Sequence, residues 1–193
     1  MVKTHKMRVS QLKIYLDKKS TRPDILNEPT IKDAHSFCVV NDVPPQQYGL
    51  MLEKYIQIKN NFTKTSSSEC RGDCSTNGVN IEIKTSLGGA SHSKFNWVQL
   101  RVSHNIHEYY LTAYHLTHEN VDREGDLYVF RVSKEAILLL VAKYGHYAHG
   151  TVAEHGEITL ENLIDEKNKK EYALRASFGD KCWKSMLPFQ IAE

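Results

Sequence analysis

The 193-residue sequence has no apolar run long enough to cross a bilayer. Its longest apolar stretch covers residues 136–142, in the middle of the chain. Residues 1–6 have no apolar core of the kind that defines a secretion signal. These absences exclude a membrane-spanning helix, and we expect a cytoplasmic protein without a membrane partner.

Cysteine is scarce, and without a secretion signal a disulfide framework is not expected. The net charge is only +2, so the overall balance does not indicate a nucleic-acid partner. The charge is uneven, however, because residues 1–22 hold seven Lys or Arg against one acid, Asp17. That excess could neutralise phosphates, and it is equally consistent with a solvated basic helix. The four cysteines are Cys38, Cys70, Cys74 and Cys182.

The composition is ordinary for a folded globular chain, with 40% hydrophobic and 25% charged residues. A chain of this length can bury a substantial core. We find no internal repeat and no long low-complexity tract. The sequence therefore predicts one domain over residues 1–193, or one domain with an appended lobe.

Helix signals occur at several points along the chain. Ser10 is a suitable N-cap for a helix to about Lys19, and a proline pair at 44–45 suits the first turn of a second helix. Ser133 is a suitable cap for a third helix, which Gly145 would end. The predicted helices cover residues 10–19, about 44–59 and 134–143, with shorter ones possible after Thr159 and after Asp180.

Strand signals fill the middle of the chain. Val79, Ile81 and Ile83 alternate with polar residues, the pattern of a half-buried strand that Gly88-Gly89 would end. Residues 95–102 could form a strand or a short helix. Further strands are predicted over 108–116, 127–132 and about 171–176. Several antiparallel strands between helices predict an α/β or α+β fold, with a mixed central sheet flanked by helices.

Asn77-Gly78 is the strongest short hairpin signal in the sequence and favours a two-residue type I′ turn. Counting outward from that turn pairs Thr76 with Val79 and Asp73 with Glu82. Opposite residues in an antiparallel pair have Cβ atoms roughly 4.5–5.5 Å apart, and like charges there are destabilising. A divalent cation such as Mg²⁺, which is held by one or two carboxylates, would neutralise the two acids.

Lys84 lies two residues beyond Glu82, on the same face of the strand and roughly 6.5–7 Å away. A lysine in that position can bind a phosphate, orient an attacking water or stabilise negative charge in the transition state. A metal ion would polarise the phosphoryl group and activate the water. Asp73, Glu82 and Lys84 are therefore our candidate catalytic residues.

Gly72-Asp73 and Ile81-Glu82-Ile83-Lys84, with eight residues between Asp73 and Glu82, resemble the motif of the PD-(D/E)XK nuclease superfamily. The segment that follows, ending in residues 95–101, is similar to type II restriction endonucleases in particular. Gly72 stands where the proline that names the motif would be, a common substitution in this group. The resemblance covers about residues 45–145 and implies a restriction-endonuclease-like catalytic core.

The resemblance implies that Asp73 and Glu82 bind Mg²⁺, one or two ions per site, and that Lys84 assists hydrolysis. It also suggests Glu53 and Gln99 as supporting residues. The function implied is site-specific cleavage of double-stranded DNA, leaving 5′-phosphate and 3′-hydroxyl ends, by a homodimer whose symmetry matches a palindrome. The candidate DNA contacts are Lys94, Asn96, Arg101 and His149.

Other interpretations of the same residues remain open. Glu82 and Lys84 could alternate simply because one face of an exposed strand is polar. Cys70 and Cys74, with histidine pairs such as His104 and His107, could bind zinc, although Cys74 would face the apolar side of the hairpin. The chain could also be a structure-specific or repair nuclease of the same superfamily, or a nucleic-acid-binding module without catalysis.

Overall fold

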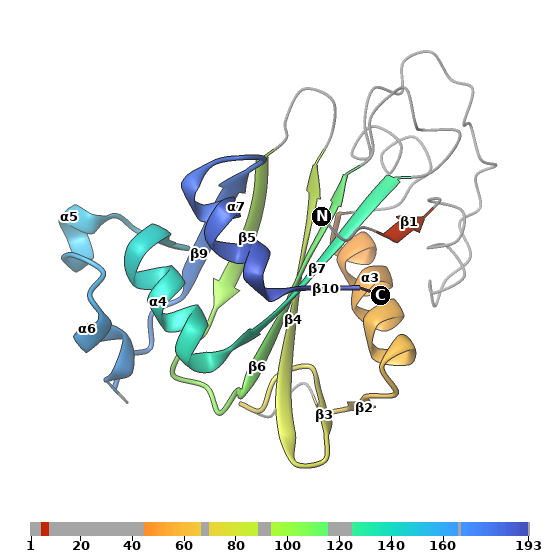
Figure 1. Cartoon of the computed structure of the whole chain (residues 1–193). Helices are drawn as coiled ribbons and strands as arrows, with labels where there is room; N and C mark the ends of the chain where they lie inside the picture. Colours follow the sequence, from red (N-terminus) through yellow and green to blue (C-terminus); the bar gives the residue numbers. More distant parts are fainter. Residues whose placement is uncertain are drawn as a thin grey trace.

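A computed structural model of the chain describes residues 5–7, 45–66, 70–88, 94–115, 125–165 and 167–192 (Figure 1). Side chains are described from Gly49 onward. The predicted helix over 10–19, most of the basic segment 1–22, and Cys38 lie outside the described residues. Within the described ranges, no helix is long and apolar enough to span a membrane.

The helices begin and end close to where the sequence predicts. Helix α3 covers Pro45–Lys59 and α4 covers Lys134–Tyr144. The Ser133 side chain accepts a hydrogen bond from the Ala136 N–H, and the Gly145 N–H closes the last turn on the Val141 carbonyl. Both cap predictions for α4 are thereby confirmed. The shorter helices are α5 (Val152–His155), α6 (Leu160–Ile164), α7 (Lys181–Met186) and a 3₁₀ turn, η2 (Leu187–Phe189).

The strands form two sheets. The seven-stranded main sheet has the order β1-β7-β6-β4-β3-β2, with β10 also paired to β7, and the three-stranded second sheet has the order β5-β9-β8. The main sheet contains β1 (His5–Met7), β2 (Thr63–Lys64), β3 (Cys74–Thr76), β4 (Val79–Gly88), β6 (Glu108–His115), β7 (Gly125–Ser133) and β10 (Gln190–Ile191). The second sheet contains β5 (Lys94–Leu100), β8 (Gly145–Tyr147) and β9 (Tyr172–Ser177).

The two central strands of the main sheet, β4 and β6, run parallel, from Ile81 opposite Glu108 to Gly88 opposite His115. The expectation of antiparallel strands was therefore wrong for this pair. Parallel neighbours need a crossover connection, and β5 supplies it by leaving the main sheet and pairing with β9. The undecided segment 95–102 is thus mainly a strand, and the central sheet is mixed.

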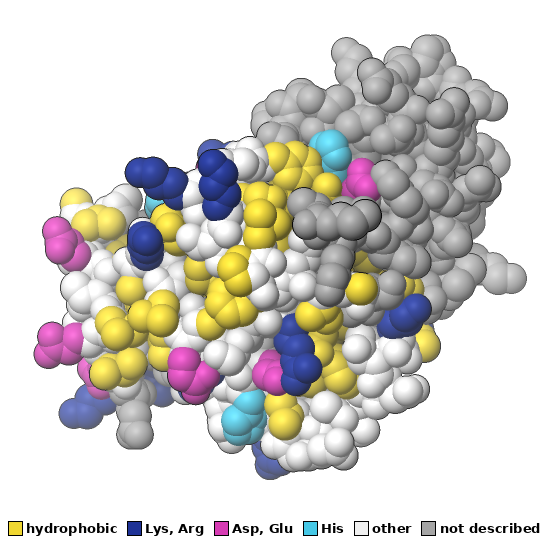
Figure 2. Space-filling view, in the orientation of Figure 1, with side chains coloured by type: hydrophobic (Ala, Val, Ile, Leu, Met, Phe, Trp, Pro, Cys, Tyr) yellow, Lys and Arg dark blue, Asp and Glu magenta, His cyan; other side chains and the backbone are white. Residues whose placement is uncertain are grey.

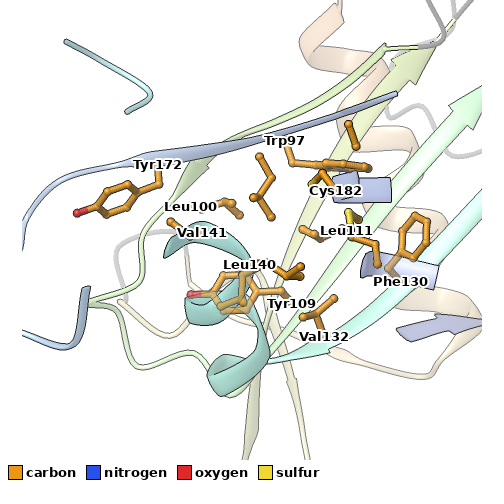
Figure 3. Close-up of a cluster of buried hydrophobic side chains, with 14 of the residues drawn as sticks. Trp97, Leu100, Tyr109, Leu111, Phe130, Val132, Leu140, Val141, Tyr172 and Cys182 are labelled. Carbon is orange, nitrogen blue, oxygen red and sulfur yellow. The ribbon is translucent and has the colours of Figure 1, made fainter. Parts of the chain in front are cut away.

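Two hydrophobic cores lie on the two faces of the main sheet. The α3 core joins the inner face of α3 to β4 and includes Met51, Leu52, Ile56, Ile81 and Ile83. The large core lies between the main sheet, the second sheet and α4, and includes Trp97, Tyr109, Leu111, Phe130, Val141 and Trp183 (Figure 3). Strand β4 is consequently covered on both faces.

The helices that cover the large core also have apolar outer surfaces. Figure 2 shows apolar side chains gathered over α4 and α6. Leu139 of α4 and Ile164 of α6 are 59% and 61% exposed, although α4 buries Ile137 and Val141 on its inner side. Helix α4 is therefore apolar on both its core-facing and its outward-facing sides.

Candidate active site

The β3–β4 hairpin has the turn and the register that the sequence predicts. Asn77 and Gly78 adopt φ values of 47° and 79°, the left-handed conformations that a type I′ turn requires. Thr76 lies opposite Val79, and Cys74 lies opposite Ile81. The hairpin therefore places Asp73, the residue before Cys74, next to the part of β4 around Ile81.

Asp73 itself does not continue the ladder, so the predicted strand pair of Asp73 with Glu82 was wrong. The Asp73 N–H donates to the Ile81 carbonyl at 2.9 Å, and its carboxylate Oδ2 accepts from the Ile83 N–H at 2.8 Å. The carboxylate thus takes the position that a backbone carbonyl would occupy in a continued β3. The side chain is held at the edge of β4 instead of standing on its face.

Gly72 allows this departure from the ladder. Its φ of 81° is left-handed, and a Cβ atom at this position would lie 2.4 Å from the Ile81 carbonyl oxygen. The Thr65 hydroxyl donates to the Gly72 carbonyl and holds the turn from the other side. Only glycine fits where the chain approaches β4 this closely.

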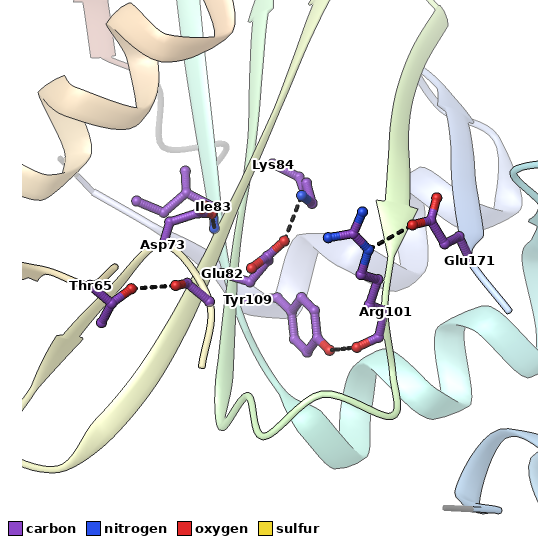
Figure 4. Close-up of polar contacts among 9 residues, drawn as sticks. Thr65, Asp73, Glu82, Ile83, Lys84, Arg101, Tyr109 and Glu171 are labelled. Carbon is purple, nitrogen blue, oxygen red and sulfur yellow. Dashed lines mark hydrogen bonds and ion pairs between the residues drawn. The ribbon is translucent and has the colours of Figure 1, made fainter. Parts of the chain in front are cut away.

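Glu82 and Lys84 share one face of β4, as predicted, and form an ion pair of 2.5 Å between Oε1 and Nζ (Figure 4). A half-buried strand would expose its polar face to water. Glu82 is only 7% exposed, so this face of β4 is covered. The cause is the large core on that side, where the fully buried Tyr109 of β6 lies beside Glu82 in register. Glu82 is therefore a buried carboxylate paired with a lysine, which an exposed polar strand face does not explain.

Glu53 joins the same site from α3. Burial raises the pKa of its carboxyl to about 7, with the charges of Asp73 and Glu82 adding to the rise and those of Lys64 and Lys84 opposing it. Its Oε1 accepts a hydrogen bond from the Gln57 amide at 2.9 Å. The structure therefore brings Glu53 into electrostatic contact with the Asp73, Glu82 and Lys84 group that the sequence singled out.

The pKa of Asp73 is also raised, first by burial and then by the charge of Glu82. The hydrogen bond from the Ile83 N–H and the charges of Lys84 and Arg101 act in the opposite direction. Mutual repulsion of carboxylates that burial already disfavours is the arrangement that a bound cation relieves. The cluster formed by Glu53, Asp73, Glu82 and Lys84 is called the carboxylate cluster below.

Carboxylate oxygens, which the carboxylate cluster supplies, are the donors that Mg²⁺ prefers. In the part of the chain that the structure describes, no three His, Cys, Asp or Glu side chains are placed to hold a metal together. Mg²⁺ does not need three, because it binds one or two carboxylates and completes its shell with waters and phosphate oxygens. Asp73 uses Oδ2 and Glu82 uses Oε1 in their contacts, which leaves each carboxylate a second oxygen.

The cysteines are poorly placed for the zinc alternative. Cys74 is fully buried opposite Ile81, and burial raises the pKa of its thiol to about 12, which disfavours the thiolate that zinc requires. Cys70 is exposed. His107 is already engaged, since its Nδ1 accepts a hydrogen bond from the Asn80 N–H at 2.8 Å. These contacts favour oxygen ligands at this end of the molecule.

Three of the other predicted residues lie on the second sheet. Gln99 is exposed at a β-bulge of β5 with a φ of 59°. Lys94 and Asn96 are exposed on the same strand, opposite Ser177 and Arg175 of β9. The structure therefore places Gln99, Lys94 and Asn96 at exposed positions of β5, and the Asn96 N–H donates to the Ser86 hydroxyl of β4 at 2.8 Å.

Arg101 and His149 converge on a glutamate that sequence reasoning missed. The Arg101 Nε lies 2.6 Å from Glu171 Oε1, and His149 Nε2 lies 3.6 Å from Glu171 Oε2. Figure 4 shows the Arg101 guanidinium between Glu171 and the ion pair of Glu82 with Lys84. Arg101 and Glu171 are 70 residues apart in the chain, so no local pattern could have paired them.

No protein-family model, curated protein or solved structure matches this chain. The geometry and charge of the site itself are therefore the basis on which a function can be assigned to this chain.

Proposed function

We propose that this protein is a Mg²⁺-dependent endonuclease that hydrolyses the phosphodiester backbone of double-stranded DNA, with Asp73, Glu82 and Lys84 as its catalytic residues. The observation that carries the proposal is the carboxylate cluster, in which buried Glu82 and partly buried Asp73 and Glu53 repel one another beside a lysine. The mixed sheet with α3 packed on β4 also supports a core like that of restriction endonucleases.

Each residue of the cluster has a separate task in this proposal. Asp73 and Glu82 would hold the metal through their second oxygens, and the Ile83 N–H keeps the Asp73 carboxylate in place. A bound Mg²⁺ would supply a Lewis acid at the phosphate and lower the pKa of a nearby water. The Lys84 ammonium stabilises the negative charge that develops on the phosphate oxygens.

Glu53 adds proton exchange to the site. Its carboxyl has a pKa raised to about 7, so part of it is protonated near neutral pH before a cation arrives. A proton on Glu53 lowers the repulsion within the cluster, and its release restores the anionic form that a cation favours. Glu53 would therefore hold a proton when the cluster is empty and lose it when a cation binds.

The proposal also concerns partners and location. We propose that the enzyme acts on cytoplasmic DNA and cuts both strands as a two-fold homodimer, because a symmetric dimer presents one active site to each strand. Light scattering after gel filtration measures the subunit number directly.

Plasmid cleavage tests the proposed chemistry. Purified protein with Mg²⁺ is expected to cut a defined plasmid, and Lys84→Ala and Glu82→Ala are each expected to lower the rate by at least about 100-fold. Lys167→Ala, an exposed lysine elsewhere on the chain, is the matched control. Cleavage at the wild-type rate by both site variants would refute the proposal, and cutting confined to branched or mismatched DNA would change the substrate class.

A further inference from the structure

A basic pocket of about 370 Å³ opens beside the carboxylate cluster. Its walls come from three separate segments, namely the turn before β3, the loop between β5 and β6, and the residues that lead into β9. The lining includes Cys70, Arg101, Ser103, His104, Asn105 and Lys169. We call it the Arg101–Lys169 pocket.

The wall of the pocket is fixed to the active-site turn by backbone hydrogen bonds. The Asn105 N–H donates to the Cys70 carbonyl at 3.0 Å, two residues before Gly72. The Lys134 ammonium donates to the His104 carbonyl at 2.9 Å and holds the loop from below. The pocket and the turn that carries Asp73 therefore keep one relative position.

The charge in the pocket is predominantly positive. Arg101 pairs with Glu171 through Nε, yet its side chain remains 44% exposed, so its terminal amino groups can donate hydrogen bonds to a further anion. Lys169 is exposed at the opposite wall. The pKa of His104 is lowered by burial and by the charges of Arg101, Lys169 and Lys84, which shows that these cations act on one place.

Lys84 belongs both to the cations that act on His104 and to the carboxylate cluster, because it also pairs with Glu82. Arg101 likewise acts on both sides, since its charge lowers the pKa of Asp73 while its side chain lines the pocket. An anion in the pocket would thus lie on the same side of β4 as the scissile phosphate would.

We propose that the Arg101–Lys169 pocket binds a backbone phosphate of the DNA strand being cut, next to the phosphate that is hydrolysed. This inference rests on the proposed nuclease function and adds the path of the strand, from the carboxylate cluster toward β9. Lys170 plays a different part, because its ammonium donates to the His155 carbonyl at 3.0 Å and lies 5.3 Å from the centre of the Tyr147 ring. Arg101 and Lys169 therefore supply the binding charge.

The first experiment measures DNA affinity with and without Lys169. Fluorescence anisotropy of a labelled DNA duplex is recorded with Ca²⁺ in place of Mg²⁺, over a series of salt concentrations, and the DNA is checked by gel to be intact. Each neutralised phosphate contributes about 0.9 to the salt slope, so at 0.1 M salt Lys169→Ala should weaken binding about 8-fold. Lys167→Ala, the exposed lysine two residues away, should retain wild-type affinity and slope.

The second experiment places charge in the pocket at Cys70. In a Cys38→Ser background, exposed Cys70 is converted to a mixed disulfide by methanethiosulfonates that carry either a sulfonate or a trimethylammonium group. Cys74 and Cys182 react slowly because both are buried and both have a pKa raised to about 12. The sulfonate adduct should bind DNA at least about 5-fold more weakly than the ammonium adduct.

The outcomes separate this inference from the nuclease proposal. Lys84-dependent cleavage together with equal DNA affinity of Lys169→Ala and Lys167→Ala would overturn the pocket assignment and leave the nuclease proposal standing. A Lys169-dependent loss of affinity without cleavage that depends on Lys84 or Glu82 would support the pocket as a nucleic-acid phosphate site and refute the nuclease proposal. Equal affinity of the two Cys70 adducts would count against the pocket in either case.

Discussion

Replacing Glu53 by glutamine should stabilise the metal-free protein, and more so at high pH than at low pH. Glutamine keeps the shape of the side chain and can still accept the hydrogen bond from the Gln57 amide. It removes a charge that burial and the neighbouring Asp73 disfavour, as the rise of the Glu53 pKa from 4.5 to about 7 shows.

The sign and size of the stability change follow from the pKa of Glu53 in the unfolded chain, 4.5, and in the folded protein, about 7. The folded state binds a proton on Glu53 more tightly than the unfolded state, so the stability of the wild type falls as the pH rises from about 4.5 through about 7. A tenfold change in acid dissociation is worth about 1.4 kcal/mol, which gives a penalty of about 1 kcal/mol at pH 5 and about 3 kcal/mol at pH 8. Partial solvent screening of Glu53 makes these values upper limits.

Urea unfolding in EDTA at pH 5 and pH 8 measures the effect. The advantage of Glu53→Gln over the wild type should grow by as much as about 2 kcal/mol between the two pH values. Glu157→Gln, an exposed carboxylate in the loop before α6, controls for the general loss of a negative charge. An advantage that is equal at both pH values, or that matches the control, would refute the electrostatic account of the carboxylate cluster.

Three further predictions test other parts of the structure. Gly72→Ala should lower the free energy of unfolding by at least about 2 kcal/mol, and clearly more than Gly179→Ala, because both have left-handed φ values but only Gly72 faces a backbone oxygen at 2.4 Å; urea unfolding of the two variants compares them. Ser133→Ala should cost about 1 kcal/mol by removing the α4 cap, and restoration of stability by Ser133→Asp would show that the cap is responsible. Addition of Mg²⁺ at pH 7 should release protons from Glu53 in wild-type protein and measurably fewer protons from Glu53→Gln, which calorimetry in buffers of different ionisation enthalpy detects; equal release would contradict the assignment.

Local signals in the sequence were sufficient for much of this structure. The Asn77-Gly78 turn predicted the β3–β4 register, and Ser133 and Gly145 predicted both ends of α4. Such signals succeed because turns and caps are decided by residues within a few positions of one another. The same locality explains why Asp73, Glu82 and Lys84 could be proposed together, since one hairpin connects them.

Features that depend on distant segments could not be predicted in the same way. The period of two in β4 says nothing about the direction of its partner, so the parallel pairing with β6 went unrecognised. The burial of Glu82 depends on Tyr109 and on the second sheet, and the ion pair of Arg101 with Glu171 joins two segments that lie next to different strands. The local sequence predicts which face of a strand a side chain occupies. Whether that face is buried depends on segments from elsewhere in the chain.

The hydrogen bond from the Ile83 N–H to the Asp73 carboxylate gives the carboxylate cluster a spectroscopic reporter of its own. The amide proton points at the oxygen atoms that would respond first to a cation or to a change in protonation. Its NMR chemical shift should therefore follow the ionisation and occupancy of the site without any added label. Its exchange with solvent should slow whenever that carboxylate is held in place, so one backbone proton measures how firmly the site is assembled.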